Sequence, residues 1–192
     1  MIYEFKVTLR YVRPPVWRRI QLPGSISLEE LHDALQIVMG WTNSHMHQFI
    51  KGKQYYGVPV PLSGDDMVSE TSVSLAKVLP RKGAKLIYEY DFGDSWEHDI
   101  VVENILRDED APPAKKKTAL CLAGKRASPP EDCGGPPGYE NLLATLANPQ
   151  DPEHHDMLEW IGGSFDPATF DLDKINRGLK RLKLHEPSAR NS

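Results

Sequence analysis

The chain has 192 residues, with 23 lysines and arginines against 27 aspartates and glutamates, so its formal net charge is −4. This balance argues against a protein that holds nucleic acid by bulk positive charge. A hydrophobic content of 40% supports a folded core, and no apolar run approaches the ~18 residues of a membrane helix. The 16 prolines and 14 glycines favour a loop-rich α+β domain over a helical bundle.

The N-terminal segment predicts two strands and a helix. Residues 3–11 alternate between apolar and polar side chains, which is typical of a half-buried strand. A second strand is predicted at 16–22, between a Pro-Pro and a Pro-Gly step. Ser27 and Glu30 then form a capping box, and the apolar spacing over 28–38 predicts a helix.

The next segments predict short elements separated by loops. Residues 45–50 and 54–58 predict two strands around a Gly-Lys turn. Prolines, a glycine and an acidic pair predict a loop at 59–72, and 73–79 predicts one or two helical turns.

Residues 86–102 predict a hairpin, because both arms alternate clearly. A two-residue turn would place carboxylates on the aromatic face. A three-residue turn at 93–95 instead pairs Tyr90 with His98 and buries one apolar face, and burial sets the register of a strand pair. We therefore predict the three-residue turn. Its buried face comprises Leu86, Tyr88, Tyr90, Phe92, Trp96, His98, Ile100 and Val102.

This register has an electrostatic consequence. It sets Asp91 opposite Glu97 and Glu89 opposite Asp99, and like charges that face each other destabilise a sheet. Solvent, a basic ligand, a metal ion or neighbouring arginines would relieve the repulsion. The arginines in question are Arg10, Arg18 and Arg19, and we expect Arg18 or Arg19 to bridge Asp91 and Glu97.

The C-terminal half predicts loops and helices. Residues 107–118 combine an acidic run, Pro-Pro and three lysines, which predicts an exposed loop. Segment 129–138 predicts an ordered loop, because its Pro-Pro steps lower the entropy lost on ordering. We expect residues 1–184 to form one domain and 185–192 a disordered tail. Helical patterns occur at 139–147, 151–161 and 172–182.

Histidines and cysteines are the remaining reactive side chains. His45 and His47 are two apart on a predicted strand, so they point the same way and could bind a divalent ion with His98 and a carboxylate. The alternative is a pair of packed polar side chains. Cys121 and Cys133 belong to no Cys-x-x-Cys pair, and the chain opens without a signal-peptide pattern. We therefore expect free thiols and a cytoplasmic protein.

Three sequence motifs occur in series along nearly the whole chain. They are Pro15-Val16-Trp17-Arg18-Arg19 with the later Gly40-Trp41, His45 and Phe49; Tyr90 to His98; and Pro129 to Gly135 followed by Gly138-Tyr139. Together they resemble the Ri-plasmid ORF-three-like family, whose members occur on plasmids, in transposable elements and in ordinary genomes. The resemblance implies an α+β fold in which a curved antiparallel sheet wraps on a helix, with C-terminal helices. It implies no established biochemical role.

Some members of that family carry a transposon-resolvase-like (TnpR-like) label. A serine resolvase needs an early catalytic serine with an arginine cluster and a basic DNA-binding segment. Here the first serine, Ser25, falls in a turn, and the chain is acidic. The sequence therefore gives the label no chemical support.

Our first hypothesis for function is a non-enzymatic binding module without a cofactor. It would hold a protein, peptide or small ligand in a groove between the sheet and the C-terminal helices, and it needs neither nucleic acid nor a membrane. Its candidate binding residues are Trp17, Arg18, Arg19, Trp41, Asp91, Trp96, Glu97, Glu131, Asp132 and Cys133.

Two further hypotheses follow in rank. The second is a metal-dependent phosphoester hydrolase, in which a divalent ion activates water and a carboxylate acts as general base. The third is a nucleic-acid accessory role, although its basic pattern is equally typical of a solvated helix face. The hydrolase would use His45, His47, Asp91, Asp94, Glu97 and His98. The accessory role would use residues 115–117, Lys174, Arg177 and Arg181.

Overall fold

The structure is a computed structural model that describes residues 1–59, 66–107, 109 and 119–184. Its strands are β1 (Ile2–Leu9), β2 (Trp17–Pro23), β3 (His47–Lys51), β4 (Gln54–Gly57), β5 (Val68–Ser69), β6 (Lys85–Tyr90), β7 (Trp96–Leu106) and β8 (Leu120–Lys125). Its helices are α1 (Leu28–Met39), the 3-10 turn η1 (Glu70–Ser72), α2 (Leu75–Val78), α3 (Gly135–Ala147), α4 (His154–Trp160) and α5 (Leu172–Leu179).

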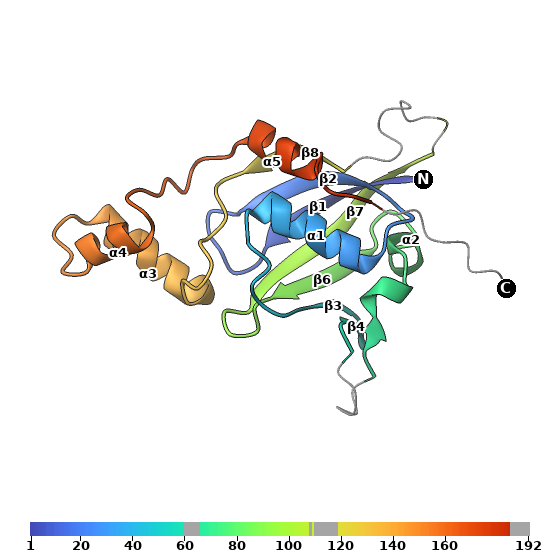
Figure 1. The fold of residues 1–192 in the computed structure, drawn as a ribbon, viewed down its shortest axis with the longest axis horizontal. Coiled ribbons are helices and arrows are strands. Elements are labelled where there is room, and N and C mark those ends of the chain that lie inside the picture. Colours follow the sequence, from blue (N-terminus) through green and yellow to red (C-terminus); the bar gives the residue numbers. More distant parts are fainter. Residues whose placement is uncertain (60–65, 108, 110–118, 185–192) are drawn as a thin grey trace.

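The strands form one sheet in the order β5-β4-β3-β6-β7-β1-β2-β8. Neighbouring strands pair antiparallel, except that β4 and β5 are parallel. In Figure 1, α1 lies across one face of the curved sheet, and α5 packs on both α1 and β8. The expected α+β fold, a curved and largely antiparallel sheet wrapped on a helix with C-terminal helices, is confirmed.

Helix α1 forms where the sequence predicts it. Ser27 and Glu30 make the complete capping box, and Gly40 ends the helix in the left-handed conformation with φ of 77°. The apolar stripe of the helix is fully buried against the sheet. It comprises Leu28, Leu31, Leu35 and Val38.

The β6–β7 hairpin has a longer turn than the sequence predicts. Tyr90 pairs with Trp96 rather than with His98, so the connection is the five-residue segment 91–95. Phe92 falls in this turn and is 44% exposed, so its predicted burial is wrong. The predicted register is off by two residues, and a two-residue shift keeps the same side chains on the same face. Burial alone therefore could not choose between the two registers.

Four other elements differ from the prediction. Strand β8 was not predicted, β5 and η1 lie inside the predicted loop at 59–72, and α3 begins at Gly135 instead of Tyr139. The predicted loop at 107–118, apart from residues 107 and 109, and the predicted tail at 185–192 lie outside the described residues. No helix of the described residues is long and apolar enough to cross a membrane.

Candidate functional site

The three sequence motifs meet beside the turn between β6 and β7. Trp41 Nε1 donates to the Pro129 carbonyl oxygen at 2.9 Å. The Glu131 carboxylate accepts from the Thr42 backbone N–H at 2.9 Å and from the Tyr90 hydroxyl at 2.6 Å. Burial and the neighbouring Glu131 carboxylate raise the pKa of Tyr90 to about 12, so its hydroxyl remains a donor at neutral pH. We define the loop junction as residues 40–46, 90–95 and 129–135.

His45 lies between two carboxylates in the loop junction. Its Nδ1 is 3.5 Å from Asp91 Oδ2, and its Nε2 is 3.1 Å from Asp132 Oδ1. One ligand atom from each of the three residues can be chosen so that all lie within 4.8 Å of one another. The Nε2 atom is buried and makes no well-directed hydrogen bond. An imidazole and two carboxylates at this spacing form a donor set that suits a divalent metal ion.

The turn conformation aims the Asp91 carboxylate at His45. Asp91 adopts the left-handed conformation with φ of 59°, which aspartate tolerates better than most residues. Its Oδ1 accepts from the backbone N–H of Gly93 at 2.9 Å and of Asp94 at 3.3 Å. Its own N–H donates to the Met46 carbonyl oxygen at 2.8 Å. These bonds close the five-residue turn and leave Oδ2 toward His45.

Two glycines let the third motif pack against this turn. The Gly134 N–H donates to Asp94 Oδ2 at 3.2 Å. Gly135 has φ of 68°, and a Cβ at this position would overlap the Asp94 carbonyl oxygen. A Cβ at Gly138 would overlap the Cys133 carbonyl oxygen. The close backbone approach explains why glycines stand at these positions. Residues 129–134 form a loop, and 135–138 form the first turn of α3 rather than part of the predicted loop.

The other two histidines of the hydrolase hypothesis lie elsewhere. His47 Nε2 is 2.8 Å from Glu70 Oε2, and its ring stacks on His32 with 3.5 Å between centroids. His98 is fully buried under the sheet, where its Nδ1 lies 3.3 Å from the Tyr88 carbonyl oxygen. Burial lowers the pKa of His98 to about 4. The hydrolase residues therefore do not gather at one place.

The acidic face of the hairpin is neutralised by Arg10 rather than by Arg18 or Arg19. Glu89 faces Glu97 across the hairpin. Arg10 follows β1 and pairs with Glu97, and its Nε is 3.1 Å from Asp99 Oδ1. The Gln48 side chain donates to Glu89 at 2.7 Å.

The prediction that Arg18 or Arg19 bridges Asp91 and Glu97 is wrong because of the strand register: Arg19 pairs with Lys6 of β1, and Lys6 pairs with Val101 of β7, four residues beyond Glu97. Arg19 bonds to Glu103 instead, with 3.1 Å between Nη2 and Oε1. Arg18 turns inward and hydrogen-bonds to backbone carbonyls.

Some of the predicted binding residues lie outside the loop junction, and the others lie within it. Trp96 is fully buried, Trp17 stacks beneath Lys6 and Arg19 on the sheet, and Glu97 pairs with Arg10. The members that lie in the loop junction are Trp41, Asp91, Glu131, Asp132 and Cys133.

Neither cysteine provides a ready nucleophile. Cys133 is half-buried, and burial together with Asp94 raises the pKa of its thiol to about 12. Burial raises the pKa of Cys121 to about 11. Both side chains are therefore protonated thiols at neutral pH, and the thiolate is the reactive form.

Sequence reasoning missed the buried polar cluster around His32. His32 Nδ1 lies 2.7 Å from the Tyr88 hydroxyl, and Nε2 lies 2.8 Å from Asn43 Oδ1. Gln36 donates to the same Tyr88 hydroxyl at 2.9 Å. The available signal was the spacing of His32, which stands four residues after Leu28 on the apolar stripe of the helix.

Comparison with known proteins identifies the family. The sequence profile of the plasmid pRiA4b ORF-3-like protein family matches residues 1–174. The chain belongs to this family. The uncharacterized protein y4hQ of Sinorhizobium fredii (strain NBRC 101917 / NGR234) is 38% identical over 183 residues, which cover 94% of this chain and 92% of that protein.

A solved structure shares the fold. The crystal structure of MM3350, a protein of unknown function from Methanosarcina mazei Go1, superposes with a TM-score of 0.76 and 37% sequence identity. The match covers 89% of this chain and 95% of that chain. Both relatives are uncharacterised, and neither their names nor the family description indicates an enzymatic function.

Proposed function

We propose that this plasmid ORF-3-like protein is a binding module that holds a divalent metal ion at the loop junction, through His45, Asp91 and Asp132. The observation that carries the proposal is that both ring nitrogens of His45 face carboxylate oxygens. A neutral imidazole has one N–H, so one of its nitrogens would set a lone pair against an oxygen lone pair. A metal ion bound to one ring nitrogen removes that conflict, because the other nitrogen then carries the N–H that donates to a carboxylate oxygen.

The donor set narrows the choice of ion. One nitrogen and two carboxylate oxygens suit Zn²⁺ or Mn²⁺ better than Ca²⁺, which prefers six to eight oxygens. Three protein donors leave coordination positions open. Asp132 is exposed, with 69% of its side chain accessible, so those positions would face solvent and could accept a ligand from a partner.

Open coordination also supports metal-dependent hydrolysis as a second candidate. A metal ion with a free position can bind water and lower its pKa. The further acids of the loop junction are already engaged: Glu131 accepts from Thr42 and Tyr90, and Asp94 accepts from the Gly134 N–H. This engagement supports the binding role over general-base catalysis.

Metal titration of matched variants tests the proposal. Asp91→Asn keeps the oxygen that accepts from Gly93 and Asp94 while it removes the charge, and His45→Gln removes the ring. Isothermal titration with Zn²⁺ and Mn²⁺ should show at least about tenfold weaker binding in both variants. His155→Gln and Asp173→Asn change exposed residues outside the junction and should bind like the wild type.

Two results would decide against the proposal. One is that the wild type binds neither ion more tightly than His45→Gln does. The other is that the control variants lose as much affinity as the junction variants. A phosphoester assay on the metal-loaded wild type separates the candidates: turnover abolished by Asp91→Asn favours the hydrolase, and its absence in a protein that binds metal favours the binding module.

A further inference from the structure

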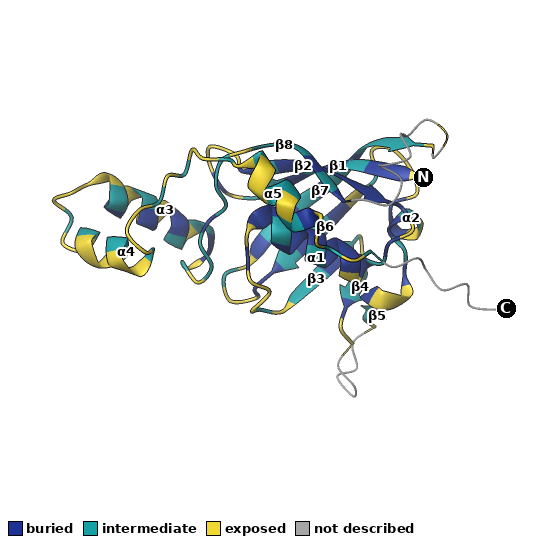
Figure 2. Cartoon of the chain, turned by 45° about the horizontal axis from the view of Figure 1, so that its top comes forward, coloured by how far each residue is buried: buried dark blue, intermediate teal, exposed yellow. Residues whose placement is uncertain are grey.

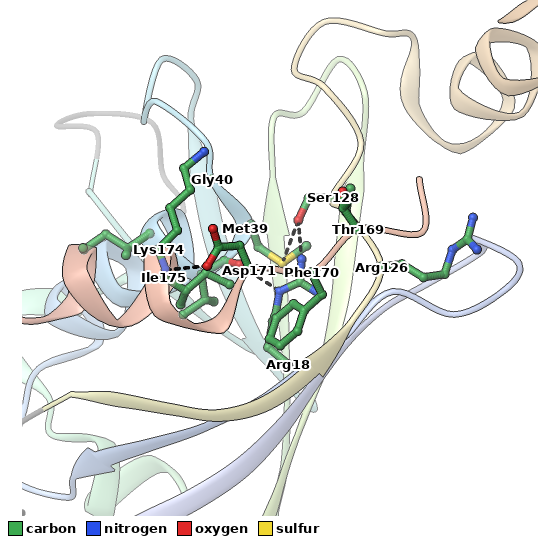
Figure 3. A pocket seen from close by; sticks show the side chains of 14 residues that line it. Arg18, Met39, Gly40, Arg126, Ser128, Thr169, Phe170, Asp171, Lys174 and Ile175 are labelled. Carbon is green, nitrogen blue, oxygen red and sulfur yellow. Dashed lines mark hydrogen bonds between the residues drawn. The ribbon is translucent and has the colours of Figure 1, made fainter. Parts of the chain in front are cut away.

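A cavity lies between the end of α1, strand β2 and helix α5, apart from the proposed metal-ligating residues. Its volume is about 340 Å³, within the ~300–1,000 Å³ range of small-molecule sites. Figure 3 shows Arg18 at its floor, Ser128 and Met39 beside it, and Lys174 reaching past Gly40 at the rim. The cavity occupies the position that the sequence predicts for a ligand groove, between the sheet and a C-terminal helix.

Arg18 is a buried cation without an acidic partner among the described residues. It is 3% exposed, and burial lowers its pKa to about 10. Its guanidinium donates to the carbonyl oxygens of Val38 at 2.9 Å, Trp17 at 2.9 Å and Lys125 at 3.1 Å. These neutral acceptors satisfy hydrogen bonds but do not balance the charge, and an uncompensated buried charge is unfavourable.

The guanidinium, which belongs to the cavity lining, also retains donor capacity within the described part of the chain. Nη2 carries two N–H groups, and the bond that the structure shows for it goes to Ser128 Oγ at 3.0 Å. A second acceptor can therefore bond to Nη2 without displacing an existing partner. An anion placed there would supply both the missing acceptor and the missing negative charge.

The remaining charges around the cavity favour an anion. Lys174 lies on the first turn of α5, and it forms no ion pair within the described part of the chain. Asp171 is the acidic residue of the lining, and its Oδ1 already accepts from the Lys174 backbone N–H at 2.8 Å. Arg126 belongs to the lining, but in Figure 3 its guanidinium points away from Arg18. With Asp171 counted against Arg18 and Lys174, the cavity still has a net positive charge.

The rest of the lining is largely apolar, apart from the hydroxyl residues Ser128 and Thr169. The Phe170 ring packs on the Arg18 guanidinium, with 5.0 Å between Cζ and the ring centroid. Apolar side chains beside a buried cation suit a molecule with one charged head and one apolar body. The other apolar side chains of the lining are Ile37, Val38, Met39, Ala127 and Ile175.

We propose that this cavity binds a small organic carboxylate, with its head group between Arg18 and Lys174 and its apolar body against Phe170 and Met39. The site is independent of the proposed metal site. Planar guanidinium groups bind carboxylates through directed hydrogen bonds, and the apolar walls would distinguish such a ligand from inorganic phosphate.

Calorimetric titration with four anions tests this proposal. Hexanoate and benzoate should bind at least about tenfold more tightly than acetate and inorganic phosphate at constant ionic strength, because only the first two fill the apolar part. Lys174→Met should weaken hexanoate binding about fivefold or more. Lys183→Met, which changes another exposed lysine, should leave it unchanged. Arg18 is not substituted in this test, because its hydrogen bonds to three backbone carbonyls also stabilise the fold.

Amide chemical shifts locate the ligand. Hexanoate should shift the signals of residues 37–40, 126–128 and 169–178 and leave those of His45, Asp91 and Asp132 in place. The same titration of His45→Gln in EDTA should give an unchanged affinity, so failure of the metal proposal would not affect this result. Equal, weak binding of all four anions, or equal affinity in Lys174→Met and Lys183→Met, would overturn the proposal.

Discussion

His32 and His98 are buried next to hydroxyl, amide and carbonyl groups rather than carboxylates. The ring of His32 contacts the Tyr88 hydroxyl and Asn43, and the ring of His98 contacts the Tyr88 backbone carbonyl. Burial lowers the pKa of both histidines to about 4, with the nearby His47 adding to the effect on His32. Both rings are therefore neutral in the folded protein at pH 7.

The free energy of unfolding should therefore decrease below pH 6.5. The folded-state pKa values near 4 lie below the ordinary value of 6.5, so between these pH values the unfolded chain binds protons that the folded chain does not. The stabilisation is complete above pH 6.5 and is lost as the pH falls toward 4, by about 3 kcal/mol for each histidine. Urea unfolding at pH 7 and pH 4.5 measures the difference.

A pair of histidine variants separates this effect from the titration of carboxylates. His98→Met removes one of the two buried rings, so the difference in stability between pH 7 and pH 4.5 should shrink by about 2 kcal/mol. His155→Met changes an exposed ring and should leave the difference as it is in the wild type. Equal pH dependence in both variants would contradict the assignment to His98.

Arg10 should stabilise the hairpin, because its positive charge offsets the negative charges of the hairpin carboxylates. Replacing it with methionine leaves Glu89 and Glu97 facing each other and frees Asp99. Because the side chains of Arg10 and Glu97 are 29% and 28% exposed, solvent screening limits the loss to about 1 kcal/mol. Urea unfolding at pH 7 should show this loss at low salt and a smaller one in 1 M NaCl. Arg177→Met, on the exposed side of α5, should show neither.

For the secondary-structure elements, the sequence predicted which side of a strand is buried better than it predicted the turns and the pairing between strands. Alternation assigned the buried side of β6 and β7, but the five-residue turn depends on side-chain bonds of Asp91 that no periodicity reveals. Strand β8 was missed because its sequence contains alanine and glycine and lacks clear alternation. Its position at the sheet edge depends on pairing with β2, roughly a hundred residues earlier in the chain.

The sequence predicted which segments contain the candidate site, but it did not predict how their side chains are arranged. The motifs marked the segments that contain His45, Asp91 and Asp132. The expected partnership of His45 with His47 assumed a strand, whereas β3 begins only at His47 and His45 lies in the preceding loop. Contacts among three distant loops follow from the topology of the whole sheet, which local patterns do not encode.

Gly135→Ala tests the packing of the third motif on the hairpin turn. A methyl group there must displace the Asp94 carbonyl, in addition to the strain of a positive φ. Gly162→Ala is the matched control, because Gly162 has φ of 80° and open space around it. The control should lose about 1 kcal/mol of stability, and Gly135→Ala should lose more and also bind Zn²⁺ more weakly. Equal losses and unchanged Zn²⁺ binding would show that the contact does not position the site.

At the scale of the whole molecule, α3 and α4 form a helical pair that projects away from the sheet (Figures 1 and 2). The two helices pack on each other. Helix α3 is anchored through Tyr139 and Leu142, which are 2% and 3% exposed, whereas α4 contains no buried residue. Met157 and Trp160 of α4 line a small cavity with Asp132 and Cys133, so the pair borders the loop junction.

Helix α4 should therefore open at a lower free energy than the rest of the protein. Segments with few buried apolar contacts exchange their amide hydrogens through local opening, whereas central strands exchange through global unfolding. Hydrogen exchange at pH 7 should be fastest in α4, slower in α3 and slowest in β1 and β7. Similar rates in α4 and β7 would contradict a separate opening unit.

Met157→Ala should make this difference larger. Met157 is half-buried against α3, so its truncation should cost about 1 kcal/mol of local stability, less than at a fully buried site. Exchange of the α4 amides should then rise about fivefold, while β1 and β7 remain unchanged, because opening of α4 leaves the sheet intact. Met46→Ala, at a residue that is 61% exposed, is the control and should change neither region. An equal increase in α4 and in β7 would mean that the helical pair and the sheet unfold together, so that the projecting helices belong to the same cooperative unit as the core.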